Sequence, residues 1–80
     1  MAEDPDLLLS QIGLRIQERR RDLGLTQKEL AEKVEMQQSN VARIERGEQN
    51  LTVRTLCKLA EALETTATEL FVGSSQRPSG

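Results

Sequence analysis

The stretch Thr26–Gly47, TQKELAEKVEMQQSNVARIERG, predicts two short helices joined by a tight turn. Thr26 is placed to cap the first helix, and Glu29 three residues later completes a capping box. Gly47 is suited to end the second helix, which we expect from about residue 37 to residue 46. One face of the first helix is apolar at helical spacing: Leu30, Ala31 and Val34.

The second of these helices has a narrow buried edge and a polar outer face. Val41 and Ile44 are its only large apolar residues. The opposite face carries short or polar side chains: Gln38, Ser39, Ala42 and Arg43. A helix of this kind is suited to lie in the major groove of DNA.

Four motifs at these spacings resemble the lambda-repressor-like (Xre-type) helix-turn-helix domains. They are IGLRI, then RRDLGLTQKELA, then a polar helix ending in RIERGE, then TLCKLAEAL, and together they extend from about Ile12 to Phe71. The resemblance implies an all-α fold, a compact five-helix DNA-binding domain with the helix-turn-helix at its second and third helices. It also implies a transcriptional regulator that binds double-stranded DNA sequence-specifically, as a homodimer on a palindromic operator.

The remaining elements are expected on both sides of this core. Residues 1–6 are predicted to be a disordered acidic N-terminus, residues 7–73 the domain, and residues 74–80 a flexible tail. The first helix is expected to begin between Leu7 and Ser10 and to bury Ile12 and Ile16. Asn50 or Thr52 is expected to cap the fourth helix, and a short fifth helix opens at Thr66 with Glu69 in a capping box.

The composition argues against several classes of protein. The sequence has one cysteine and no histidine, which excludes an internal disulfide and leaves no usual ligand set for zinc or base for catalysis. We therefore expect no enzymatic activity, metal, cofactor or small-molecule ligand, and we expect Cys57 to be a packed thiol. The apolar run at residues 7–9 is too short for a membrane span, so a cytoplasmic protein without membrane contact is predicted.

Charge is distributed unevenly along the chain. The net charge is −2, which argues mildly against a nucleic-acid partner. Residues 15–46, however, hold eight basic and six acidic residues, so the segment proposed to face DNA is net positive. The first six residues hold three acids and no base.

The predicted DNA contacts fall into two groups. Gln38 is the first choice for a base contact because its amide can bond adenine N6 and N7 together. The other expected base contacts are Ser39, Asn40 and Arg43, with arginine matched to guanine. Contacts to phosphate are expected from Gln27 at a helix start, and from Arg20, Arg46, Asn50 and Arg54.

Five residues in and near the motif matter because of what the family usually has there. The resemblance implies a partly buried ion pair between Arg20 and Glu45. Arg19 stands where the family is usually apolar, and we expect its stem to cover the core while the guanidinium reaches water. Glu35 replaces a frequent glycine, so a left-handed residue is expected there at a cost of about 1–2 kcal/mol. Gln37 is a weak N-cap for the recognition helix.

A homodimer is expected because one recognition helix covers too few base pairs for tight specificity. With helices one to three used by the core and DNA, the dimer surface is predicted on the C-terminal half: Leu51, Val53, Leu70, Phe71 and Val72. The opposing interpretation is that Phe71 closes the core of the monomer.

The biological setting stays open at this point. A phage-type repressor, a controller protein of a restriction–modification system and an antitoxin all fit the motifs. The main alternative function is a protein-interaction module with weak DNA binding, which the negative net charge favours.

Overall fold

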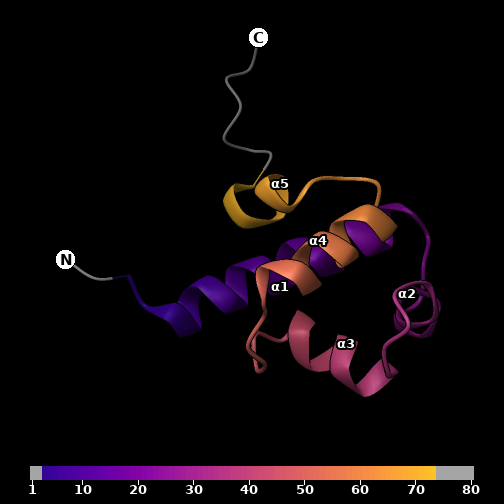
Figure 1. Cartoon of the computed structure of the whole chain (residues 1–80), viewed down its shortest axis with the longest axis horizontal. Helices are drawn as coiled ribbons and strands as arrows, with labels where there is room; N and C mark the ends of the chain where they lie inside the picture. Colours follow the sequence, from indigo (N-terminus) through magenta and orange to yellow (C-terminus); the bar gives the residue numbers. More distant parts are fainter. Residues whose placement is uncertain (1–2, 74–80) are drawn as a thin grey trace, which may run out of the picture.

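The computed structural model describes residues 3–73 and contains five α-helices in that range (Figure 1). They are α1 (Pro5–Asp22), α2 (Gln27–Lys33), α3 (Gln38–Glu45), α4 (Val53–Ala62) and α5 (Ala67–Val72). No strand occurs in the described part of the chain. The all-α fold with its five helices is therefore confirmed.

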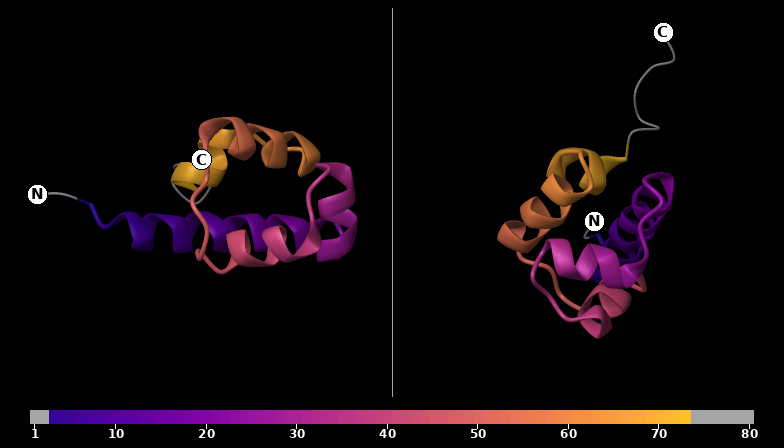
Figure 2. Two further views of the ribbon diagram at one scale, coloured as in Figure 1. Left: turned by 60° about the horizontal axis from the view of Figure 1, so that its bottom comes forward. Right: turned by 90° about the vertical axis from the view of Figure 1, so that its right-hand side faces the viewer.

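The helices are arranged around α1, the longest of them. Both α3 and α5 pack against α1, while α2 packs against α3 and α4 against α5. Two views of the ribbon show α2 and α3 on one side of the molecule and α4 and α5 on the other (Figure 2). The fold thus consists of two helix pairs that pack against one long helix.

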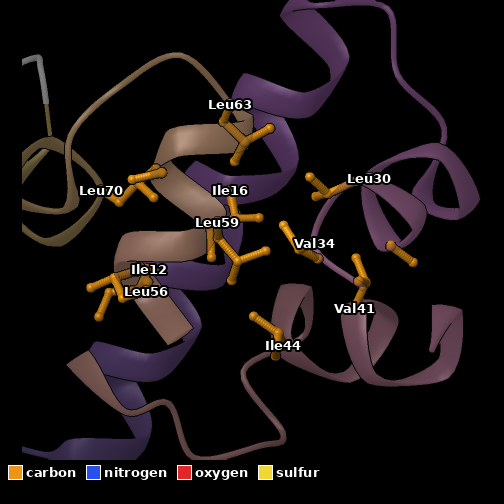
Figure 3. Close-up of a cluster of buried hydrophobic side chains, with 12 residues drawn as sticks. Ile12, Ile16, Leu30, Val34, Val41, Ile44, Leu56, Leu59, Leu63 and Leu70 are labelled. Atoms are coloured by element: carbon orange, nitrogen blue, oxygen red, sulfur yellow. The ribbon is translucent and has the colours of Figure 1, made fainter. Parts of the chain in front are cut away.

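The core is aliphatic and lies between these two pairs. Figure 3 shows Leu30, Val34, Val41 and Ile44 facing Ile16, Leu59 and Leu63. All seven side chains are buried. Burying side chains of this size contributes roughly 1.5–3 kcal/mol each. The apolar faces of α1, α2, α3 and α4 therefore determine how the two helix pairs pack.

Two glycines allow α1 and α3 to approach closely. A Cβ on Gly13 would lie 2.3 Å from the carbonyl oxygen of Ile44, and one on Gly47 would lie 2.6 Å from Cα of Ser10. Gly47 also has a φ of 72°, the left-handed conformation expected of a helix stop. A side chain at either position would push α3 away from α1.

The first helix begins earlier than expected. Asp4 caps it by accepting a hydrogen bond from the backbone N–H of Asp6, and Pro5 occupies the first helical position. Proline there has no N–H to leave unpaired, so the acidic segment starts a helix well. The prediction of a disordered segment reaching residue 6 is therefore wrong for residues 4–6. Residues 1–2 and the predicted tail at 74–80 lie outside the described residues.

Other local predictions are confirmed. Thr26 and Glu29 form the full capping box, and Thr52, rather than Asn50, caps α4. Thr66 caps α5 by accepting from the backbone N–H of Glu69. The carboxylate of Glu69 instead accepts from the hydroxyl of Thr65, so this second box is only half formed.

Candidate DNA interface

The predicted recognition helix α3 lies at one edge of the molecule, and no other helix covers its outer side (Figure 1). Val41 and Ile44 anchor it in the core. Gln38, Ser39 and Arg43 are exposed, and Asn40 is half-buried. None of these four side chains makes a hydrogen bond within residues 3–73, which leaves their donors and acceptors available to a ligand.

The turn before α3 has the geometry expected where the family has glycine. Glu35 has a φ of 59°, in the left-handed region. The N–H of Met36 donates to the carbonyl of Ala31 at 2.9 Å, the bond that defines a Schellman ending for α2. Gln37 makes no side-chain cap, as predicted.

A buried polar cluster joins α1, α2 and α3 beneath the interface. Nε of Arg20 donates to Oε2 of Glu45 at 2.6 Å, and Nη2 donates to Oε1 at 3.1 Å. Nη1 of Arg20 donates to the carbonyl of Leu25 at 2.8 Å, just before the Thr26 cap. The two charged side chains are only 9% and 1% exposed, so the predicted Arg20–Glu45 pair exists and is fully enclosed.

This burial gives Arg20 a structural role beside the phosphate contact expected of it. Its guanidinium is committed to Glu45 and to Leu25 and lies under the surface. The phosphate contact expected of Arg20 stays a prediction, because Glu45 and Leu25 use only three of the five guanidinium N–H groups. Within the protein, Arg20 joins α1 to α3 and to the segment before α2.

The remaining predicted phosphate contacts lie at the surface. Arg46, Asn50 and Arg54 are exposed, and Gln27 is half-buried at the first position of α2. Arg46 pairs with Glu48 at 3.2 Å, but both side chains are 58% exposed. Such a pair contributes about 0–1 kcal/mol, so Arg46 can leave it at little cost.

The predicted dimer residues divide between core and surface. Val53, Phe71 and Val72 are 76%, 51% and 44% exposed, and we call these three residues the apolar patch. Leu70 is only 3% exposed and belongs to the core, which corrects its assignment to an interface. The reason is that α5 turns Leu70 toward the other core side chains (Figure 3). Leu51 is half-buried and packs against the core.

Three features of the structure were not predicted from the sequence. Arg15 donates to the carbonyls of Leu70 and Phe71, and Arg19 to those of Leu63 and Glu64. These arginines of α1 therefore satisfy the carbonyl ends of α4 and α5, so the Arg19 guanidinium is not simply solvated as expected. Glu64 has a left-handed φ of 59°, which was not predicted from the sequence. Cys57 is exposed, so the expectation of a packed thiol is wrong.

Comparisons with known proteins identify the family. The HTH_3 helix-turn-helix family matches residues 16–70. The chain belongs to this family. It is 36% identical over 69 residues to the uncharacterized HTH-type transcriptional regulator y4dJ of Sinorhizobium fredii, covering 86% of this chain and 90% of y4dJ.

Solved structures of restriction–modification controller proteins are also similar. C.AhdI from Aeromonas hydrophila is 38% identical, with a TM-score of 0.76 over 79% of this chain and 96% of C.AhdI. C.Esp1396I, solved as a tetramer with its natural 35-base-pair operator, is 33% identical, with a TM-score of 0.72 over 80% of this chain and 84% of C.Esp1396I. The helix-turn-helix transcriptional regulator assignment is therefore confirmed.

Two further features are absent from residues 3–73. No helix there is long and apolar enough to cross a membrane. No group of three or more potential metal ligands occurs among the same residues.

Proposed function

We propose that this protein is a cytoplasmic, non-catalytic regulator that binds a palindromic operator as a homodimer. The observation that carries the proposal is the outward face of α3. Gln38, Ser39 and Arg43 project from a helix whose other side is fixed in the core. Rigid placement matters because bidentate readout of a base tolerates little movement of the side chain.

In this proposal, the base contacts are made by Gln38, Ser39, Asn40 and Arg43. Gln27, Arg46, Asn50 and Arg54 contact phosphates and set the register of α3 in the groove. Lys28 is exposed beside Gln27 and adds positive charge at the same end of α2. Arg20 and Glu45 stay inside the protein and hold α2 and α3 at a fixed angle.

The apolar patch supports the homodimer. Val53 lies at the start of α4, while Phe71 and Val72 lie at the end of α5, and all three expose apolar surface to water. In the proposed two-fold pair this patch is buried, and the two recognition helices bind half-sites one helical turn of DNA apart, about 34–36 Å. Assembly on operator DNA by C.Esp1396I, a similar protein, is consistent with this arrangement.

The experiment is selection of binding sites from a random pool of duplexes. The proposal predicts an enriched site with two-fold symmetry and half-sites about ten base pairs apart. Gln38→Ala should enrich a site in which one position of each half has lost its preference. A pool with no enrichment by the folded wild-type protein would instead favour a protein-interaction module.

A further inference from the structure

The buried cluster has a fourth member, which lies at the predicted DNA surface. Nε2 of Gln27 donates to Oε1 of Glu45 at 2.9 Å. Gln27 is the first residue of α2, and Glu45 is the last residue of α3. This bond therefore joins a residue expected to contact phosphate to the helix expected to contact bases.

The chemistry of Glu45 fixes which way the Gln27 amide faces. A carboxylate only accepts hydrogen bonds, so it must be approached by the NH₂ group of the amide and not by its carbonyl oxygen. Glu45 accepts three such bonds, two from Arg20 and one from Gln27, while its side chain is 1% exposed. The amide NH₂ of Gln27 has two hydrogens, so one remains available for a phosphate oxygen.

Arg20 makes this arrangement compatible with a nearby phosphate. An unpaired carboxylate beside a phosphate would repel it, and the effect is stronger away from bulk water. The two bonds from the guanidinium neutralise Glu45 where it meets Gln27. The cluster therefore presents a donor at the surface while its net charge stays near zero.

We propose that Glu45 is a positioning residue for DNA binding, because it orients the Gln27 amide toward a phosphate. The phosphate contact of α2 then depends on the last residue of the recognition helix, and the two helices bind as one unit. This inference rests on the proposed function and adds a residue that touches no DNA itself.

The variant Glu45→Gln tests the orientation with little change in size. Oε2 of Glu45 accepts the shorter bond, from Nε of Arg20 at 2.6 Å, and we expect the amide oxygen of the variant to take that place. Its NH₂ group then takes the place of Oε1, where it faces both Nη2 of Arg20 and the amide of Gln27. Gln27 must then turn its own carbonyl oxygen inward to accept and move its NH₂ group, or else lose the bond. In either case the amide is no longer held with a donor toward the phosphate.

The experiment is a double-mutant cycle on affinity for a selected duplex. Gln27→Ala should weaken binding by the wild-type protein about 3- to 10-fold, the range that one net hydrogen bond supplies. In the Glu45→Gln background the same substitution should have no effect. A loss by the same factor in both backgrounds would overturn the proposal.

Lys28→Ala is the matched control, because Lys28 is the exposed neighbour of Gln27 and makes no hydrogen bond to Glu45. Its effect on affinity should be the same with Glu45 and with Gln at that position. If Glu45→Gln also changed the effect of Lys28→Ala, its role would be a general one in holding α2. Thermal melts should confirm that every variant is folded at the temperature of the binding assay.

A spectroscopic measurement gives a second, independent result. The side-chain amide resonances of Gln27 in a ¹H–¹⁵N spectrum of the free protein should shift in Glu45→Gln and stay unchanged in Lys28→Ala. An unshifted Gln27 amide in Glu45→Gln would contradict the inference. Absence of DNA binding by the wild-type protein, with the shift present, would instead refute the proposed function and leave the contact as a structural one.

Discussion

The two helix pairs of this domain are built alike and expose different chemistry. In each pair, the first helix ends at a glutamate with a φ of 59°, Glu35 after α2 and Glu64 after α4. Each ending has the same backbone bond, from Met36 to Ala31 at 2.9 Å and from Thr65 to Ala60 at 3.0 Å. Yet the exposed side chains of α3 are all polar, whereas α5 exposes Phe71 and Val72 in addition to two polar residues, Thr68 and Glu69.

This difference shows that the turn does not determine what a helix pair does. The turn only fixes the angle at which the second helix leaves the first. Function follows from the side chains that remain exposed once the core is filled, and only α5 adds large apolar groups to its polar ones. We therefore propose that the first surface binds DNA and that the apolar groups of the second bind another copy of the chain.

The largest expected effect comes from the buried ion pair that joins α1 to the first helix pair. Arg20→Ala should lower the free energy of unfolding by about 3–5 kcal/mol, because it leaves the Glu45 carboxylate buried and unpaired. Arg46→Ala is the control, since its pair with Glu48 is exposed and should contribute about 0–1 kcal/mol. Urea unfolding measures both, and equal losses would mean that burial of the first pair has no energetic consequence.

The next effect concerns the polar surface of α3. Gln38→Ala and Arg43→Ala should each weaken binding to the best operator by about 1–3 kcal/mol and relax the preference at one base pair. Neither should change thermal stability, because both side chains are exposed. Competition assays against single-base variants of the operator measure the affinity and the preference at each base pair. If both variants kept every base preference, α3 would not be the reading element.

A smaller effect is expected at the apolar patch. Val72→Asp should raise the dissociation constant of the dimer about tenfold or more, because it replaces buried apolar surface with a charge. Thr68→Asp, an exposed position on the same helix, is a control for added charge alone. Sedimentation at tens of micromolar protein should resolve the difference. A wild-type chain that stays monomeric at every concentration would contradict the proposal that the apolar patch is a dimer interface.

The smallest effect tests the shared turns. Glu35→Gly and Glu64→Gly should each raise the free energy of unfolding by about 0.5–1 kcal/mol. This net gain is the left-handed strain that is relieved, minus the extra conformational entropy that glycine loses on folding. Glu32→Gly, inside α2, should lower it by about 1 kcal/mol. Thermal unfolding of the three variants measures this. A loss of stability in Glu35→Gly would mean that the strain is absent.

Features set by neighbouring residues were predictable from the sequence. The capping box of Thr26 and Glu29 needs only a spacing of three residues. The left-handed Glu35 was expected because the family that the sequence resembles often has glycine there. The Arg20–Glu45 pair came from the family resemblance and not from spacing, because its partners are 25 residues apart.

Features set by tertiary packing were not predictable. Leu70 and Phe71 are adjacent and both apolar, and only the docking of α5 decides that the first is buried and the second exposed. Cys57 follows Leu56 by one residue, which rotates it about 100° away from the core face of α4. The bonds from Arg15 and Arg19 to carbonyls of α4 and α5 join residues 44 or more positions apart.

The most direct test of the central claim is a salt titration of DNA binding. Affinity for a selected palindrome and for random duplexes should be measured between about 50 and 200 mM salt. We predict that the logarithm of affinity falls linearly with the logarithm of salt for both, and that the palindrome is bound at least about a thousandfold more tightly throughout. Equal affinity for both duplexes, or affinity that does not respond to salt, would contradict the assignment of α3 to sequence-specific DNA recognition.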